Sequence, residues 1–267
     1  LCKGKKIGAF ALTEPNAGSD AGSIEATARL DGDHYILNGT KRFITNGGEG
    51  GIFIVFASTN KELKHKGISA FIIEDGYEGF SKGKHEDLMG IRATANCELM
   101  FEDCKVPKEN LLGEEGLGFK IAMGTIDVSR IDIGAQAVGI SQAALDESVK
   151  YSKERKQFGK PICEFEFIQG MLANMATSID AARLLVLRVA YMKDKGEKWF
   201  SRESAMAKWY ASEIAVEVTR QACQIHGGYG YTKDYPVERL FRESKIMELY
   251  EGTSEIQKIV IARSLLR

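Results

Sequence analysis

The sequence lacks a surplus of charge of either sign, a paired set of cysteines and any long apolar run. Its 36 lysines and arginines nearly balance 37 aspartates and glutamates, so composition gives no reason to expect a nucleic-acid or membrane-surface partner. The five cysteines are odd in number and form no C-x-x-C pair, which argues against a disulfide framework or a zinc site and favours reduced thiols. No apolar run approaches ~18 residues, so we expect no membrane-spanning helix.

The chain also begins without an initiator methionine and without the apolar segment of a signal peptide. The chain is then either a fragment of a longer protein or a natural truncation. The unpaired cysteines favour a reducing compartment, a bacterial cytoplasm or, for a eukaryotic source, a mitochondrial matrix. Apolar residues make up 44% and charged residues 27% of the sequence, which is ordinary for a globular protein. At 267 residues the chain can form one large domain or two smaller ones, each with its own core.

Up to about Leu112 the sequence has the period and the punctuation of short β-strands. Turn residues such as Asn38 and Gly39 separate the alternating or apolar runs 7–12, 26–30, 34–37, 52–57, 68–73 and 97–101. Gly32, between two aspartates, predicts a hairpin there, because Asp-Gly accepts positive φ at low cost. Regularly spaced strands without helices between them predict an antiparallel β-barrel or sandwich domain over residues 1–112.

Beyond Gly113 the apolar period becomes that of helices. Apolar side chains recur in steps of three and four over 138–152, 168–189 and 207–225, and Gly196 and the Gly227-Gly228 pair supply breaks. Three long amphipathic helices and a shorter C-terminal pair cannot bury their apolar stripes singly. We therefore expect an up-down four-helix-bundle domain over residues 113–267, and an α+β multidomain chain as a whole.

Five motifs contain the candidate catalytic and binding residues. They are residues 10–20 (FALTEPNAGSD), 43–47 (FITNG), 155–159 (RKQFG), 224–228 (QIHGG) and 249–255 (LYEGTSE). Taken singly, a carboxylate such as Glu251 before Gly-Thr is most often a helix cap, and a Ser/Asn/Gly-rich segment is usually only a turn. The order of all five along one chain makes these ordinary interpretations less favourable.

The motifs in this order resemble the acyl-CoA dehydrogenases, nearest to the butyryl-CoA (short-chain) branch, over the whole chain. That family is built from an N-terminal helical domain, a β-barrel and a four-helix bundle. This sequence resembles only the last two parts, so we expect exposed apolar surface. The resemblance implies FAD, an acyl-CoA substrate, an electron-transferring flavoprotein as acceptor, and a homo-oligomer arranged as a dimer of dimers. Four acyl carbons follow by analogy only.

Residue roles follow from the same resemblance. Glu251 matches the base that removes the α-proton of the acyl thioester, while the β-hydrogen leaves as hydride to FAD. The position that supplies the base in some relatives holds Ser129, which cannot serve. The implied substrate contacts are Ser19, Asp127, Arg130, Tyr250 and Gly252, although Asp127 and Arg130 also fit an ordinary i,i+3 ion pair on a helix.

The implied FAD contacts form a larger set, in which the residues from Arg155 to Gly228 resemble segments that reach the FAD of a neighbouring subunit. The set consists of Phe10, Leu12, Thr13, Ser19, Phe43, Ile44, Thr45, Arg155, Gln157, Phe158, Gln224, Ile225, Gly227, Gly228, Thr253, Ser254 and Glu255. Three alternatives remain open. An acyl-CoA oxidase or an enoyl-CoA reductase would share this site, and an FAD-binding fragment without turnover would keep it unused.

Overall fold

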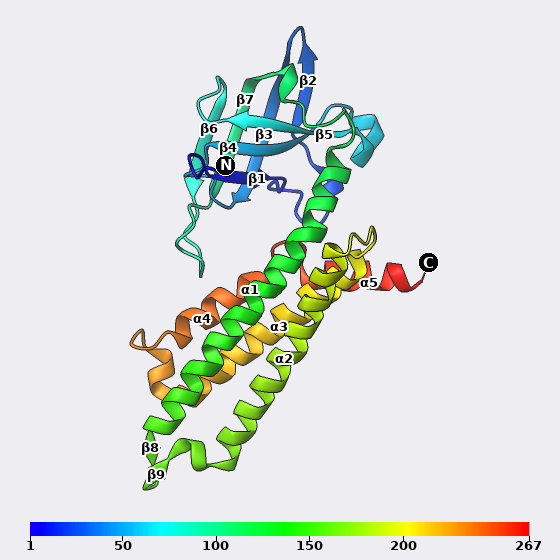
Figure 1. Cartoon of the computed structure of the whole chain (residues 1–267). Helices are drawn as coiled ribbons and strands as arrows, with labels where there is room; N and C mark the ends of the chain where they lie inside the picture. The colour runs from blue at the N-terminus through cyan, green and yellow to red at the C-terminus, as the bar shows by residue number, and fades with distance from the viewer. Residues whose placement is uncertain (267) are drawn as a thin grey trace. The chain divides into compact units, whose positions relative to one another are not determined.

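The computed structural model describes residues 1–266 and divides the chain into two compact units, Leu1–Thr125 and Ile126–Arg267 (Figure 1). Unit 1 holds a mixed β-sheet and unit 2 is helical, which confirms the predicted fold class. The predicted division after residue 112 falls between the last long strand, which ends at Pro107, and the first long helix, which begins at Gly118. Each unit is described by itself.

Unit 1 contains a seven-stranded sheet in the order β1-β4-β2-β3-β7-β6, with β5 paired to β4. The strands are β1 (Gly8–Ala11), β2 (Thr27–Asp31), β3 (His34–Ile44), β4 (Ile52–Ser58), β5 (Ile68–Glu74), β6 (Phe80–His85) and β7 (Cys97–Pro107). The predicted hairpin is confirmed, because Asp31 pairs with His34 and Gly32 takes a φ of 61°.

Two features of the sheet differ from the sequence-based expectation. β1 and β2 both pair with β4 in parallel, whereas the predicted barrel was antiparallel throughout. β6 was not predicted at all, because its sequence contains Gly83 among basic residues and alternates only weakly. Tertiary pairing with β7 on one side determines both the existence and the register of β6.

Alternation along the strands fills one core in unit 1. Phe53 and Val55 of β4 and Phe71 and Ile73 of β5 are fully buried, and together with Leu99 they form the centre of the cluster. Aromatic rings meet at favourable edge-on angles, as between Tyr35 and Phe71, whose centroids lie 4.9 Å apart.

Unit 2 contains most of the long helix α1 (Gly118–Glu154) together with α2 (Glu166–Asp194), α3 (Ser201–His226), α4 (Val237–Ser244) and α5 (Ser254–Leu265). Three long helices and a shorter C-terminal pair were predicted and are confirmed. Figure 1 shows α1, α2 and α3 as long rods, with α4 along the same bundle. Gly196 follows α2 and Gly227 ends α3, both with positive φ, which glycine adopts without strain.

The predicted apolar stripe of α2 faces the core of the bundle. Met175, Ile179, Ala182, Val186 and Val189 are buried on it, while alanines cover the facing side of α3. Small residues allow the helices to approach closely. A Cβ at Gly134 of α1, for example, would lie 2.8 Å from Cγ2 of Val186.

The opposite side of α2 carries exposed apolar side chains. Leu184, Leu187 and Tyr191 lie there at helical spacing, with 68%, 57% and 62% of their surface exposed. Over the residues that the structure describes, no helix combines the length and the apolar character needed to cross a membrane.

Candidate active site

Glu251 lies on a tight turn in unit 2, between a 3₁₀ segment (Lys245–Glu248) and α5. Its backbone is left-handed, with a φ of 54°, and that of Gly252 has a φ of 90°. A non-glycine residue in this region is strained and is held there by its surroundings. The next residue, Thr253, is the N-cap of α5, since its side chain accepts a hydrogen bond from the Ile256 N–H. Thr253 therefore caps the helix, and the Glu251 carboxylate is left for other contacts.

The carboxylate of Glu251 meets Ser129 of α1. The Ser129 Oγ donates to the Glu251 Oε2 over 2.6 Å, although 122 residues separate the two in sequence. The same hydroxyl lies 3.2 Å from the carbonyl of Ile126. The sequence excluded Ser129 as a base, and the structure places it as a hydrogen-bond donor to the residue predicted for that role.

Arg130, the next residue on α1, is buried and contacts the turn from its other side. Its Nε lies 3.3 Å from the Glu251 carbonyl oxygen, and its Nη1 forms a 2.7 Å ion pair with the Asp127 carboxylate. Burial lowers the pKa of the Arg130 guanidinium, which Asp127 and Glu251 partly offset. The hydroxyl of Ser201, at the beginning of α3, donates to the other oxygen of Asp127. The i,i+3 pair predicted from sequence is thus present, and it also braces the Glu251 turn.

Two further residues at this turn were not identified from the sequence. Lys208 of α3 is completely buried, and its Nζ donates to the Gly252 carbonyl over 2.7 Å. Gln257 of α5 is also buried, and its amide lies 2.8 Å from the same carbonyl and 3.1 Å from that of Glu251. A single sequence gives no signal for either, because a lysine in an amphipathic helix is ordinarily solvated.

Tyr250 precedes the turn and points its hydroxyl elsewhere. The hydroxyl donates to the Gln136 side chain over 2.6 Å. Burial and the nearby Glu251 charge raise the pKa of Tyr250 to about 12, so the phenol remains neutral at physiological pH. Its contact with substrate stays a prediction.

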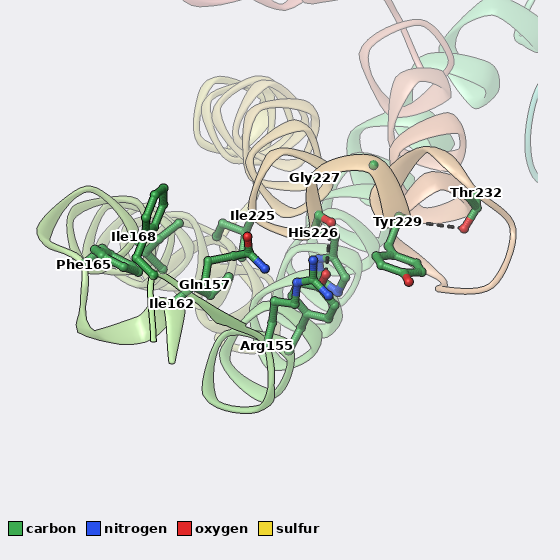
Figure 2. Close-up of a pocket in the computed structure, with 13 residues that line it drawn as sticks. Arg155, Gln157, Ile162, Phe165, Ile168, Ile225, His226, Gly227, Tyr229 and Thr232 are labelled. Carbon is green, nitrogen blue, oxygen red and sulfur yellow. Dashed lines mark hydrogen bonds between the residues drawn. The ribbon is translucent and has the colours of Figure 1, made fainter. Parts of the chain in front are cut away.

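A second group of predicted residues lines a pocket of about 570 Å³ at another part of unit 2 (Figure 2). Six residues of the implied FAD set line it: Arg155, Gln157, Phe158, Ile225, Gly227 and Gly228. In Figure 2 the Arg155 and Gln157 side chains lie near Ile225 and His226, at the end of α3. Apolar side chains such as Ile162, Phe165 and Ile168 form most of the remaining wall. Gln224 does not line the pocket, and its carbonyl accepts the Gly227 N–H at the end of α3.

The pocket combines flat apolar surfaces with one cation. The Arg155 guanidinium lies over the ring of Tyr229, 5.6 Å from its centroid. His226 stacks on Tyr151 with a centroid distance of 4.2 Å, and burial lowers the pKa of its imidazole. Such a lining suits a planar ring together with an anionic group that Arg155 can meet.

The two N-terminal motifs lie side by side in unit 1. The Arg42 N–H donates to the Thr13 carbonyl over 2.8 Å, so the 10–20 segment lies against the end of β3, which carries Phe43 and Ile44. Phe43 has a φ of 57° and an exposed ring, whereas Ile44 is buried. Thr13 is half-buried and Thr45 is exposed. Phe10 is half-buried on β1, Leu12 is buried, and Ser19 is exposed farther along the loop.

A buried ion pair holds this loop. The Lys41 Nζ lies 2.6 Å from the Glu14 carboxylate and 3.2 Å from the Leu12 carbonyl, and both charged side chains are almost fully buried. Glu14 also accepts backbone N–H groups from Glu25 and Ala26. Burial lowers the pKa of Lys41 to about 8, against the opposing effect of Glu14. Neither residue was identified from the sequence.

The remaining predicted cofactor residues follow Glu251 at the start of α5. Ser254 is buried, and its hydroxyl has no hydrogen-bond partner within the described residues, while Glu255 is exposed. A backbone hydrogen bond and the Thr253 side chain lower the pKa of Glu255. The structure therefore places Glu251, Ser129, Arg130 and Asp127 together, and gathers the 155–158 and 225–228 residues separately around the pocket.

Comparison with known proteins places this geometry in a family. The middle domain of acyl-CoA dehydrogenases matches residues 9–104, and their C-terminal domain matches residues 116–266. The chain belongs to the acyl-CoA dehydrogenase family. Members of this family are oxidoreductases that act on acyl-CoA.

Three relatives are similar over essentially the whole chain. An acryloyl-CoA reductase (NADH) of Anaerotignum propionicum is 57% identical over 100% of this chain and 68% of its own. The butyryl-CoA dehydrogenase structure of Megasphaera elsdenii has a TM-score of 0.96 and 54% identity over 98% of this chain and 68% of that one. A chain in a structure concerning the electron transferring flavoprotein of Acidaminococcus fermentans has a TM-score of 0.98 and 56% identity, covering 99% and 70%.

Proposed function

We propose that this acyl-CoA dehydrogenase converts a short-chain acyl-CoA to the trans-2-enoyl-CoA, with Glu251 as the base that removes the α-proton. The observation that carries the proposal is the Glu251 turn. Glu251 is half-buried, and its carboxylate accepts a 2.6 Å hydrogen bond from Ser129. Its backbone is left-handed, and its carbonyl accepts a hydrogen bond from Arg130. Strained backbone around a carboxylate is characteristic of functional sites.

The residues around Glu251 suit a proton acceptor. The Ser129 hydroxyl donates to the Glu251 carboxylate, and the Arg130 and Lys208 cations contact the backbone carbonyls of the same turn, so the carboxylate is held in place before the reaction. Glu251 then takes the α-proton of the thioester. Negative charge develops on the thioester carbonyl oxygen, and the backbone N–H of Glu251 is the proposed hydrogen-bond donor to it. Gly252 suits this turn, since its φ is 90° and a Cβ there would lie 2.7 Å from the Gln257 amide nitrogen.

FAD is the cofactor that we propose, and when bound it accepts the β-hydrogen together with its electron pair. The chain's own residues fit such a group in three places. The 155–158 and 225–228 pocket offers flat apolar walls and one guanidinium, which suits an aromatic ring and a phosphate. The Ser254 hydroxyl is buried and has no partner among the described residues. In unit 1, Thr13, Phe43 and Thr45 would contact the isoalloxazine ring, in line with the family resemblance.

We further propose that the enzyme is a homo-oligomer, a dimer of dimers, in which Arg155, Gln157 and the 224–228 segment contact the FAD of a neighbouring subunit. This arrangement is supported by the pocket that Arg155, Gln157 and residues 225–228 line, and by the exposed apolar side of α2. An electron-transferring flavoprotein is the proposed acceptor, which agrees with the structural relative from Acidaminococcus fermentans.

Reduction of an enoyl-CoA is the second candidate. The 57% identity to an acryloyl-CoA reductase favours it. The same residues serve both directions, since protonated Glu251 would return its proton to the α-carbon as hydride reaches the β-carbon. The direction is therefore determined by the redox partner and not by the Glu251 turn.

One experiment separates the candidates. FAD-reconstituted protein is mixed anaerobically with butyryl-CoA or with crotonyl-CoA, and flavin absorbance and acyl product are recorded. Dehydrogenation predicts flavin bleaching and crotonyl-CoA formation on butyryl-CoA, with re-oxidation by electron-transferring flavoprotein. A reductase predicts faster turnover of crotonyl- or acryloyl-CoA with NADH and reduced flavoprotein. No reaction of the flavin with any of these thioesters would reject the proposal.

A further inference from the structure

Lys208 is the most unusual side chain near the Glu251 turn. It lies on α3 with no exposed surface, and its ammonium meets the carbonyl of Gly252 instead of a carboxylate. Lysine is rarely buried completely, and burying its charge is unfavourable unless strong contacts compensate. Because this unfavourable burial is compensated by a hydrogen bond to the Gly252 carbonyl, we take that carbonyl to be the group that Lys208 holds in place.

The charges around Lys208 come from four elements. Arg130 of α1 opposes its charge, whereas Glu251, Glu248 of the preceding 3₁₀ segment and Glu255 of α5 favour it. Burial lowers the pKa of Lys208 to about 8, so the ammonium form still predominates near neutral pH. The charged form is kept in the interior beside the proposed base.

The carbonyl that Lys208 holds belongs to the strained part of the turn. Glu251 and Gly252 both have positive φ, and such backbone persists only where the surroundings fix it. Donors from three helices converge on their two carbonyls: Arg130 from α1, Lys208 from α3 and Gln257 from α5. Gln257 contacts the same carbonyl as Lys208, so this acceptor keeps a partner when the lysine is replaced.

We propose that Lys208 is a positioning residue for Glu251: by holding the Gly252 carbonyl it fixes the backbone from which the carboxylate reaches the substrate. This inference rests on the proposed role of Glu251 as base. It assigns no proton transfer to Lys208, which lies behind the turn and acts through Gly252.

The test compares the FAD-reconstituted protein with its Lys208→Met, Lys208→Gln and Lys150→Met variants. Met keeps the length of the buried chain without its charge, and Lys150 is an exposed lysine on α1 that provides the matched control. Amide hydrogen exchange of the peptide spanning 250–253 should become faster by on the order of tenfold in Lys208→Met. Flavin reduction by butyryl-CoA should slow by about 10- to 100-fold, because small misplacements of reacting groups are costly. The melting temperature should not fall.

Each remaining outcome decides against the inference. If amide exchange at 250–253 in Lys208→Met equals that of the wild type, the lysine does not fix this backbone, whatever the rate of flavin reduction. Faster exchange with an unchanged rate would show that the restraint is irrelevant to Glu251. Failure of both Lys208→Met and Lys208→Gln to fold would make Lys208 a structural residue only. Normal flavin reduction by Glu251→Gln would instead reject the proposed base, while the exchange data would still report on Lys208.

Discussion

The Ser129 hydroxyl and the Glu251 carboxylate are hydrogen-bonded at 2.6 Å, on elements that are 122 residues apart in sequence. Arg130, beside Ser129, reaches the carbonyl of the same glutamate. Helix α1 therefore contacts the proposed base both at its side chain and at its backbone. The position of the carboxylate therefore depends on residues that are distant from it in sequence, and each of these contacts can be removed by a single substitution.

Replacing Ser129 with Ala should slow flavin reduction by butyryl-CoA by about 10-fold or more. The Ser129 hydroxyl donates to the Glu251 carboxylate over 2.6 Å and fixes its orientation, and small misplacements of a reacting group are costly. The measurement is the anaerobic rate of flavin reduction. Ser129→Thr keeps a hydroxyl and should retain the wild-type rate, and an unchanged rate in Ser129→Ala would contradict the role of Ser129.

The buried Lys41 and Glu14 pair should be sensitive to the loss of one partner. Lys41→Met leaves the Glu14 carboxylate uncompensated in the interior, which should cost about 3–5 kcal/mol of the free energy of unfolding. In Lys41→Met/Glu14→Gln the amide can still accept the Glu25 and Ala26 N–H groups without a buried charge, so much of the loss should be recovered. Urea unfolding of the single and double variants measures this. A double variant no more stable than Lys41→Met would exclude coupling between the two side chains.

Lys208 should make stability increase with pH in the alkaline range. Its pKa is about 8 in the folded protein and 10.5 when unfolded, so between these values the unfolded chain binds more protons and folding becomes more favourable as pH rises. The full effect is about 3 kcal/mol, and it is absent below pH ~8, where both states are protonated. The unfolding free energy of the wild type should therefore increase relative to that of Lys208→Met as the pH rises from 8 to 10. A difference that is constant over this range would contradict the shift.

Arg155→Ala should weaken FAD binding by about 10-fold or more, the usual effect of losing one charge-assisted hydrogen bond. Flavin fluorescence titration measures the Kd, and Arg220→Ala, at an exposed i,i+3 pair with Glu217, provides a matched control. Because cofactor and assembly stabilise each other, dilution should release FAD in parallel with subunit dissociation. An unchanged Kd for Arg155→Ala, or a monomer that keeps its FAD on dilution, would reject the shared site.

Local patterns in the sequence were sufficient for the elements that depend on local physics. The hairpin at Gly32 follows from its turn residues, and the buried stripe from Met175 to Val189 follows from its helical period. The parallel pairing of β1 and β2 with β4 depends on which strands meet, and no local pattern specifies it. β6 was missed for the same reason.

The candidate site shows the same division. The family resemblance pointed to Glu251, Asp127 and Arg130, whereas Lys208 and Gln257 were not identified. Both lie within helices, and only the packing of α3 and α5 turns their polar ends toward the Gly252 carbonyl. Lys41 and Glu14 were missed because a buried ion pair cannot be distinguished from two surface charges in a single sequence.

The rate of flavin reduction by butyryl-CoA in Glu251→Gln tests the central claim most directly. Gln keeps the shape of the side chain and removes its basicity, so the anaerobic stopped-flow rate should fall by at least ~10²-fold with FAD still bound. Glu217→Gln, which changes a partly exposed glutamate on α3 that pairs with Arg220, should reduce its flavin at the wild-type rate. Near-normal bleaching of the flavin in Glu251→Gln would contradict the assignment of Glu251 as the base.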